Sequence, residues 1–299
     1  MVYENTHLWA AEQIRSRIEN RLIAKTIGSN LDFYYLGAIF PDTLFYSKDP
    51  RLSRAAYFLH GDTGVPTNAF IFDGLDQIKD RSDEKPLVFI WGFLTHCAMD
   101  IVFHPVIFYF SGYAPQDDQT SQLHSEYLHL HYETIIDRHF NNGIFFENMI
   151  NPASVKDLAI PSIRNISRRD IESCLKKQIF YFRLIHSRLY YLIFKMFARM
   201  GLVDKRLVAG FYANLNVETE KLPEKLSYRD IVSGSHRETT LENLMEDGIN
   251  MALMMIEAAY DYYVGNISKE SCKSTIAGNN LDTGRVGKTK ADIRFSLRT

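Results

Sequence analysis

Cysteine is scarce in this chain: Cys97, Cys174 and Cys272 are the three among 299 residues, and no two of them form a Cys-x-x-Cys pair. An odd number of widely spaced cysteines argues against a disulfide framework and a thiolate zinc site, and fits a reducing compartment. The chain also has little net charge: it contains 34 basic and 36 acidic residues, and its formal net charge is −2. A chain without a basic face lacks the electrostatic footprint of a protein that binds duplex nucleic acid.

Targeting and nucleotide-binding signals are also missing. The sequence contains no Gly-x-Gly-x-x-Gly, no P-loop and no Gly-x-Ser-x-Gly motif. Glu4 precedes any apolar stretch, so we expect no secretory signal and a cytoplasmic location. The apolar stretch of residues 87–110 is long enough to cross a bilayer, but it carries His96, Asp100 and His104, which are costly there. We therefore predict a buried helix with a polar stripe and no transmembrane helix.

Apolar residues recur at helical spacing, and no run of alternating strands stands out. The pattern predicts an all-α, multi-helix bundle. Helices are expected over about residues 6–25, 30–40, 52–59, 68–79, 86–105, 120–140, 167–200 and 241–264, with Pro41 and Pro105 ending two of them. We expect one helical domain over residues 1–265, followed by a polar C-terminal tail or docking arm over residues 266–299.

A polar stripe interrupts the most apolar helix. His96, Asp100 and His104 are spaced four apart and therefore line one helix face. A buried carboxylate between two imidazoles needs compensation, which a divalent cation supplies; a hydrogen-bonded network without metal is the alternative. His129 and Glu133 repeat the spacing of four on another helix, where the alternative is a solvated acidic face.

Three more polar residues, His7, Asp42 and His60, fall near helix ends among apolar neighbours. Each alone is uninformative. The whole set holds five histidines and three carboxylates on separate helices, and a helical core does not easily bury all eight without ions. Imidazole with carboxylate suits zinc, and a bridging carboxylate suits a cluster of several metals.

The order of these motifs resembles the zinc-dependent phospholipase C family, which is related to the single-strand-specific zinc nucleases. The resemblance covers residues 5–137 and rests on Thr6-His7-Leu8-Trp9, Pro41-Asp42, His60, His96-x-x-x-Asp100, His104-Pro105 and His129-x-x-x-Glu133-x-x-x-Asp137. It implies a phospholipase C-like bundle with a buried cluster of two or three zinc ions.

The resemblance also implies which residues hold each ion. One zinc would be held by Asp42, His60, His96 and Asp100; a second by His104, His129 and Glu133; and a third by His7 with Asp100 as a bridge. Asp137 would orient a ligand histidine. The chain departs from the secreted members, which ligate the third zinc through an N-terminal Trp, because it opens on Met1. The Asp100-to-His104 spacing is also shorter than theirs, which leaves His124 and His131 as alternative ligands.

The implied function is hydrolysis of a phosphodiester by metal-activated water, with Asp42 as the base that aligns it. The substrate would be a phosphoester; a phospholipid matches the family, and the missing basic face counts against long nucleic acid. Membrane contact would be at most peripheral. Phe45, Tyr46, Tyr57 and Phe58 would wall a head-group pocket or simply fill the core.

Two other classes of function stay open. The first is a non-catalytic helical scaffold with structural metal, whose coordination would be closed where a catalytic site keeps an open position. The second is a membrane-associated protein that uses the helix at residues 167–200, whose binding to liposomes would survive a chelator.

Overall fold

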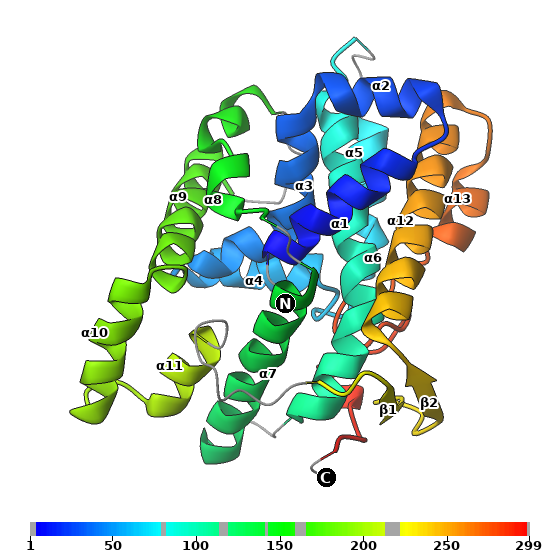
Figure 1. The fold of residues 1–299 in the computed structure, drawn as a ribbon. Coiled ribbons are helices and arrows are strands. Elements are labelled where there is room, and N and C mark those ends of the chain that lie inside the picture. Colours follow the sequence, from blue (N-terminus) through cyan, green and yellow to red (C-terminus); the bar gives the residue numbers. More distant parts are fainter. Residues whose placement is uncertain are drawn as a thin grey trace.

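The computed structural model describes residues 4–78, 82–113, 119–140, 143–158, 166–212 and 222–297. Helices dominate these residues, which confirms the all-α class (Figure 1). The α-helices are α1 (Glu4–Arg17), α2 (Arg21–Ser29), α3 (Leu31–Thr43), α4 (Pro50–Leu59), α5 (Asn68–Gln77), α6 (Lys85–Ser111), α7 (Gln119–Phe140), α8 (Phe146–Met149), α9 (Arg168–Ile185), α10 (Arg188–Arg199), α11 (Lys205–Phe211), α12 (Leu241–Val264) and α13 (Lys269–Thr275). Short 3-10 turns lie at η1 (Leu44–Tyr46), η2 (Pro152–Asp157) and η4 (Lys290–Asp292).

Helix α6 stands in the middle of the bundle, where α1, α3, α7 and α12 pack around it (Figure 1). A helix that is apolar on every side is stable only where every side is covered. By length and composition α6 could cross a membrane, but 94 % of its most apolar window is buried inside the protein. Burial of that extent is what the core helix of a folded protein shows, so α6 is weak evidence for a membrane span.

Helices α3 and α6 approach each other closely where they cross, because each helix places a glycine there. A Cβ atom on Gly37 would lie 2.1 Å from the carbonyl oxygen of Phe89, and one on Gly92 would lie 2.0 Å from that of Tyr34. No other residue type fits backbones that approach so closely. The crossing fixes α3 against α6 one turn before His96.

The prediction that Pro41 and Pro105 end their helices was wrong. Helix α3 continues through Pro41 to Thr43, and α6 continues through Pro105 to Ser111. A proline inside a helix costs about 3 kcal/mol. The turn after Pro105 buries large side chains, including Ile107 and Phe108, and each contributes about 1.5–3 kcal/mol. Packing therefore outweighs the lost hydrogen bond.

Two predicted helices are each divided by a polar residue that caps a new helix. The helix expected at 6–25 ends at Arg17, and the side chain of Asn20 accepts from the backbone of Leu22 at the start of α2. The helix expected at 167–200 stops at Ile185, and Ser187 caps α10. Asn and Ser side chains compete with the helical hydrogen bonds, which explains both breaks. The helix predicted at 241–264 is confirmed as α12, and the side chain of Thr240 caps it by accepting from the backbone of Asn243.

The part of the chain after α11 is not wholly helical. Strands β1 (Leu226–Arg229) and β2 (His236–Thr239) form an antiparallel hairpin beside α12. Residues 266–297, called the C-terminal arm below, begin with α13 and bury Cys272, Ile276 and Leu281. The arm returns to the bundle, since the backbone of Leu281 donates to the carbonyl of His60 at the end of α4.

Candidate metal centre

The eight proposed ligands lie in three neighbouring groups at the core of the bundle, two of which share His96. In each group, ligand atoms of all members lie within 4.8 Å of one another. The groups are Asp42 with His60 and His96; His7 with His96 and Asp100; and His104 with His129 and Glu133. All eight side chains are buried except His129, which is partly exposed. Each group therefore has the residue types and spacing that could hold a metal ion.

Asp100 on α6 connects the three groups. Its Oδ1 lies 3.3 Å from His7 Nε2 and 3.6 Å from His104 Nε2, and its Oδ2 lies 3.0 Å from His96 Nε2. His7 comes from α1, and its ring stacks on that of His96 at 3.9 Å between centroids. The predicted spacing of four along α6 thus places the carboxylate between His96 and His104, and α1 adds His7, which gives Asp100 the position of a bridging ligand.

Asp42 enters from the last turn of α3, which exists because that helix passes through Pro41. Its Oδ1 lies 3.1 Å from Nε2 of His60 and 3.9 Å from Nε2 of His96. His60 is the C-cap residue of α4. Three helices therefore supply this group, and the glycine crossing of α3 with α6 sets their separation.

Backbone carbonyls orient three of the imidazoles. Nδ1 of His60 lies 2.7 Å from the carbonyl oxygen of Ala56, Nδ1 of His96 lies 2.9 Å from that of Ala38, and Nδ1 of His104 lies 3.0 Å from that of Leu281. A carbonyl accepts only from a protonated nitrogen, so each contact fixes a proton on Nδ1 and, in the neutral ring, leaves the lone pair of Nε2 available to a metal. Metal-binding histidines commonly use their second nitrogen in this way.

Proton occupancy suits metal ligation at three of the five histidines, whereas nearby carboxylates, against the opposing effect of burial, raise the pKa of His60 and raise that of His96 to about 9. Burial lowers the pKa of His7 and holds those of His104 and His129 well below the ordinary value, so these rings are neutral near pH 7. Burial alone would raise the pKa of Asp100, but the neighbouring His104 and His96 hold it well below its usual range. Neutral imidazole and ionised carboxylate are the forms that bind metal.

Unpartnered buried atoms test whether this donor set fits a metal. Within the described residues, the buried polar atoms without a hydrogen-bond partner include both ring nitrogens of His7, Oδ2 of Asp42, Nε2 of His96 and of His104, and both carboxylate oxygens of Asp100. Burying such atoms unpaired costs several kcal/mol in total. Cations among them would satisfy most of these atoms, so the residues present fit a metal cluster.

The group on α7 is built from one turn of helix. Nε2 of His129 lies 2.9 Å from Oε1 of Glu133, four residues later, and Nε2 of His104 approaches the same oxygen at 4.0 Å. Burial raises the pKa of Glu133 well above its ordinary value. His131 is buried on the same helix, but among the described residues the groups that could hold a metal include His104 and neither His124 nor His131.

Asp137 lies one turn beyond Glu133 and contacts the start of α1. It accepts hydrogen bonds from Thr6 Oγ1 at 3.0 Å and from Asn5 Nδ2 at 3.3 Å. These donors directly precede His7. Its role in orienting a ligand histidine stays a prediction.

The C-terminal arm contributes residues that the sequence reading did not single out. Besides the carbonyl of Leu281, it places Oδ1 of Asp282 3.6 Å from His104 Nδ1. The ammonium of Lys290, whose side chain is partly buried, lies 3.2 Å from both Asp282 and Asp62. Burial raises the pKa of Asp282 to about 6. No periodic pattern links residue 282 to residue 104, so the sequence carried no signal for this contact.

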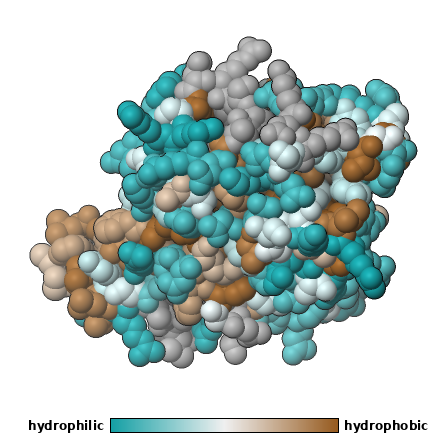
Figure 2. All heavy atoms as spheres, turned by 90° about the horizontal axis from the view of Figure 1, so that it is seen from above, coloured by the Kyte–Doolittle hydropathy of each residue, from teal (hydrophilic) through white to brown (hydrophobic). Residues whose placement is uncertain are grey.

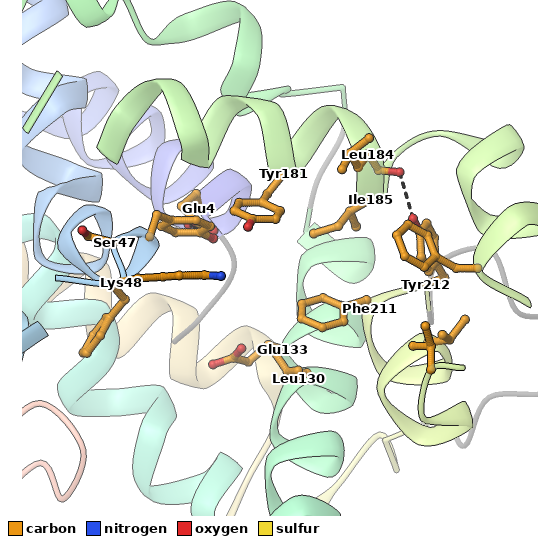
Figure 3. A pocket seen from close by; sticks show the side chains of 15 residues that line it. Glu4, Ser47, Lys48, Leu130, Glu133, Tyr181, Leu184, Ile185, Phe211 and Tyr212 are labelled. Carbon is orange, nitrogen blue, oxygen red and sulfur yellow. Dashed lines mark hydrogen bonds between the residues drawn. The ribbon is translucent and has the colours of Figure 1, made fainter. Parts of the chain in front are cut away.

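A cavity of about 560 Å³ adjoins the α7 group, and Glu133 points into it (Figure 3). Its polar lining includes Glu4 and Lys48, and its apolar walls come from η1, α9, α10 and α11. Phe45 and Tyr46 line it, as the pocket interpretation of these aromatics expected, whereas Tyr57 and Phe58 do not. We call this space the Glu133 cavity.

Glu4, like Asp282, is a buried carboxyl that was not predicted from the sequence. Tyr46 Oη and Gln178 Nε2 both donate to its Oε1, at 2.8 and 2.7 Å. Burial and the charge of Asp42 raise the pKa of Glu4 to about 7. Its position three residues before His7, on the same helix face, was the available signal.

A family model described as zinc dependent phospholipase C matches residues 6–188. No curated protein and no solved structure matches the chain. The matched span includes all eight proposed ligands and ends before α11, β1, β2, α12 and the C-terminal arm.

Proposed function

The chain belongs to the zinc-dependent phospholipase C family, and from this premise we propose that it hydrolyses a phosphodiester bond in a lipid-like substrate. The observation that carries the proposal is the position of Asp100, whose carboxylate lies among three imidazoles and joins three groups of metal-binding residues. A purely structural zinc site needs four ligands around one ion and no such bridge.

We propose two or three zinc ions. Asp42, His60, His96 and Asp100 hold the first; His104, His129 and Glu133 hold the second; His7, with Asp100 shared, holds the third. The distances within each group and the unpartnered buried atoms support this assignment. When bound, the ions supply Lewis-acid stabilisation of phosphate oxygens and acidify a water molecule to a pKa near 7.

The chain's own groups position the reactants. Asp42 Oδ2 has no hydrogen-bond partner among the described residues and is free to accept from the attacking water. Burial would raise the pKa of Asp42, but His96 and His60 lower it, so its carboxylate is ionised and able to act as an acceptor. This role assigns Asp42 as the catalytic base.

The Glu133 cavity supports a substrate with an apolar part. Tyr181, Leu184, Ile185, Phe194 and Phe211 provide its apolar wall, and the side chain of Lys48 brings a positive charge into the cavity (Figure 3). Apolar walls with few polar groups are typical of small-molecule sites. A phospholipid combines an apolar body with a phosphodiester and fits this division better than a nucleotide does.

The test combines metal analysis with a phosphodiesterase screen on the wild type, Asp100→Ala and the control Asp73→Ala, whose side chain is exposed on α5. We expect stoichiometric zinc and activity in the wild type and control, and loss of both in Asp100→Ala. A substoichiometric zinc content in the wild type would refute the cluster, and activity unaffected by Asp100→Ala would refute the mechanism. Full zinc with no activity on any phosphoester would favour the scaffold function.

A further inference from the structure

Helix α10 turns its most apolar face outward. Leu189, Leu192, Met196 and the C-cap residue Met200 follow one another at spacings of three and four, so they form one stripe along the helix. Each is between 51 % and 64 % exposed. We call these four residues the α10 stripe. Figure 2 shows hydrophobic side chains gathered at the left edge of the molecule, the side on which Figure 1 places α10.

The opposite face of α10 makes its contacts with the protein. Ala198 is its single buried residue, two positions after Met196 and therefore about 200° around the helix. With Val208 and Tyr212 it forms a small cluster separate from the main core, to which Tyr191, Phe194 and Val203 add. The stripe is thus directed away from its own fold, and an ordinary amphipathic helix would place it the other way round.

Positive charge runs beside the stripe. Arg188, Lys195 and Arg199 are spaced seven and four apart, so they form a row within about 40° on the helix surface. Arg188 lies four residues before Leu192 and is its neighbour on that surface. All three side chains are exposed, and within the described residues none of them forms an ion pair with a carboxylate.

The basic row belongs to a longer segment without acidic residues. Between Glu172 and Asp204 the chain has six basic residues and no Asp or Glu. The net charge of the whole chain is −2, so this segment concentrates positive charge that the composition conceals. An exposed apolar stripe flanked by Lys and Arg is the pattern of a helix that lies in a membrane interface.

We propose that the outward face of α10 docks on the surface of a membrane that contains anionic lipid. The α10 stripe would enter the boundary between head groups and acyl chains, and the basic row would contact lipid phosphates. A second copy of the chain is a poorer occupant, because two cationic faces brought together repel each other.

Docking on α10 would also bring the Glu133 cavity to the lipid surface. Phe194 of α10 and Ile185 of the neighbouring helix α9 both line that cavity. This consequence rests on the proposed function, since it assigns the lipid as the source of substrate. The docking itself requires only the stripe and the basic row.

Co-sedimentation with vesicles of phosphatidylcholine alone, and of phosphatidylcholine with added phosphatidylglycerol, tests the proposal. We expect the full chain to bind the mixed vesicles more tightly, with binding that weakens as salt rises and survives a chelator. Leu192→Gln should weaken binding about tenfold. The triple variant Arg188→Gln, Lys195→Gln, Arg199→Gln should weaken binding to the mixed vesicles about a hundredfold and bring it close to that on phosphatidylcholine alone.

Helix α2 offers matched controls. Leu22 and Leu192 are both 62 % exposed on short helices, and Lys25 is an exposed lysine on α2. Leu22→Gln and Lys25→Gln should bind as the wild type does. Equal binding by Leu192→Gln and Leu22→Gln would overturn the proposal, and so would equal binding to both vesicle types.

A spectroscopic variant locates the contact directly. Trp emission shifts to shorter wavelength when the ring enters lipid, so Leu192→Trp should shift with mixed vesicles and Leu22→Trp should not. A wild type that ignores vesicles but dimerises, and becomes monomeric in Leu192→Gln, would instead assign the stripe to a second copy. Vesicle binding is measured independently of hydrolysis. If Asp100→Ala kept full activity, the proposed function would be refuted, but membrane docking by α10 would still stand.

Discussion

Nδ1 of His104 lies 3.0 Å from the carbonyl oxygen of Leu281, 177 positions further along the chain. The contact brings the C-terminal arm into the candidate metal centre, although the family match ends at residue 188. The arm also caps the end of α4, because Asn280 Nδ2 donates to the carbonyl of His60. Two proposed ligands are therefore held in place by a segment outside the matched span.

Gly284→Ala tests whether the arm supports the metal centre. Gly284 has a φ of +66°, and a Cβ atom there would lie 2.6 Å from the carbonyl oxygen of Ile101, beside Asp100 on α6. The arm must move to accommodate it, and Leu281 moves with it. We expect a loss of about 2–4 kcal/mol in the free energy of unfolding and weaker zinc binding, measured by denaturant titration and by competition with a chromogenic chelator.

Gly287→Ala is the matched control. Gly287 has a φ of +67°, but a Cβ atom there would meet nothing within 4 Å. This variant carries only the backbone strain of about 1 kcal/mol, and its zinc affinity should equal that of the wild type. Equal effects of the two substitutions would mean that the arm does not support the centre through its packing on α6.

Lys290→Met tests the ion pairs behind His104. The change removes the cation that lies 3.2 Å from Asp62 and Asp282 and leaves the buried carboxylate of Asp282 beside the largely buried one of Asp62. Removing one partner of a buried pair costs about 3–5 kcal/mol. We expect that loss in the free energy of unfolding at neutral pH. Adding Asp282→Asn should restore at least half of it, and a double variant no more stable than Lys290→Met would contradict this account of the contact.

Candidate ligands on one helix could be grouped from the sequence because their pattern is local. Spacings of four on α6 and α7 place His96 with Asp100 and His129 with Glu133 on single helix faces, whatever the rest of the chain does. Helical periodicity likewise predicted the all-α class. The assignment of each residue to a particular zinc ion stays a prediction.

What the sequence reading missed depends on contacts between distant segments. The low helix propensity of proline predicts that α6 ends at Pro105. The helix continues because the turn that follows is buried. Lys290 reads as one more surface lysine in a polar tail until the fold places it between Asp62 and Asp282. Tertiary packing decides such positions, and a single sequence does not encode it in any periodic pattern.

Glu4→Gln should remove a pH-dependent cost to stability. The pKa of Glu4 is about 7 in the folded chain against 4.5 unfolded, chiefly because the side chain is buried. Between these values the folded state holds a proton that the unfolded state releases, so the wild type loses stability as pH rises through this window. The variant keeps acceptors for Tyr46 and Gln178 without the charge. We expect it to match the wild type near about pH 5 and exceed it near about pH 8, by at most on the order of 3 kcal/mol.

Chemical denaturation at several pH values checks this expectation. The informative quantity is the difference between variant and wild type, because any proton-linked loss of zinc affects both. A difference that stays constant from about pH 5 to about pH 8 would contradict the raised pKa of Glu4. Glu12→Gln is the control, since its carboxyl is partly exposed and its pKa is lowered, chiefly by its hydrogen bonds from Arg15 and Tyr35 against the opposing effect of burial. That control should lose stability relative to the wild type above about pH 5.

Gly92→Ala should separate the two helices that carry the first metal group. Its Cβ atom would lie 2.0 Å from the carbonyl oxygen of Tyr34, a contact that only movement of α3 away from α6 relieves. Asp42 on α3 and His96 on α6 would then move apart from their separation of 3.9 Å. We expect a loss of more than about 3 kcal/mol in stability together with loss of zinc. Gly28→Ala on α2, where a Cβ atom meets nothing within 4 Å, should instead raise stability by about 0.5–1 kcal/mol and keep its zinc. Thermal unfolding and zinc content of the two variants measure both effects, and wild-type zinc in Gly92→Ala would show that the crossing does not set the geometry of the centre.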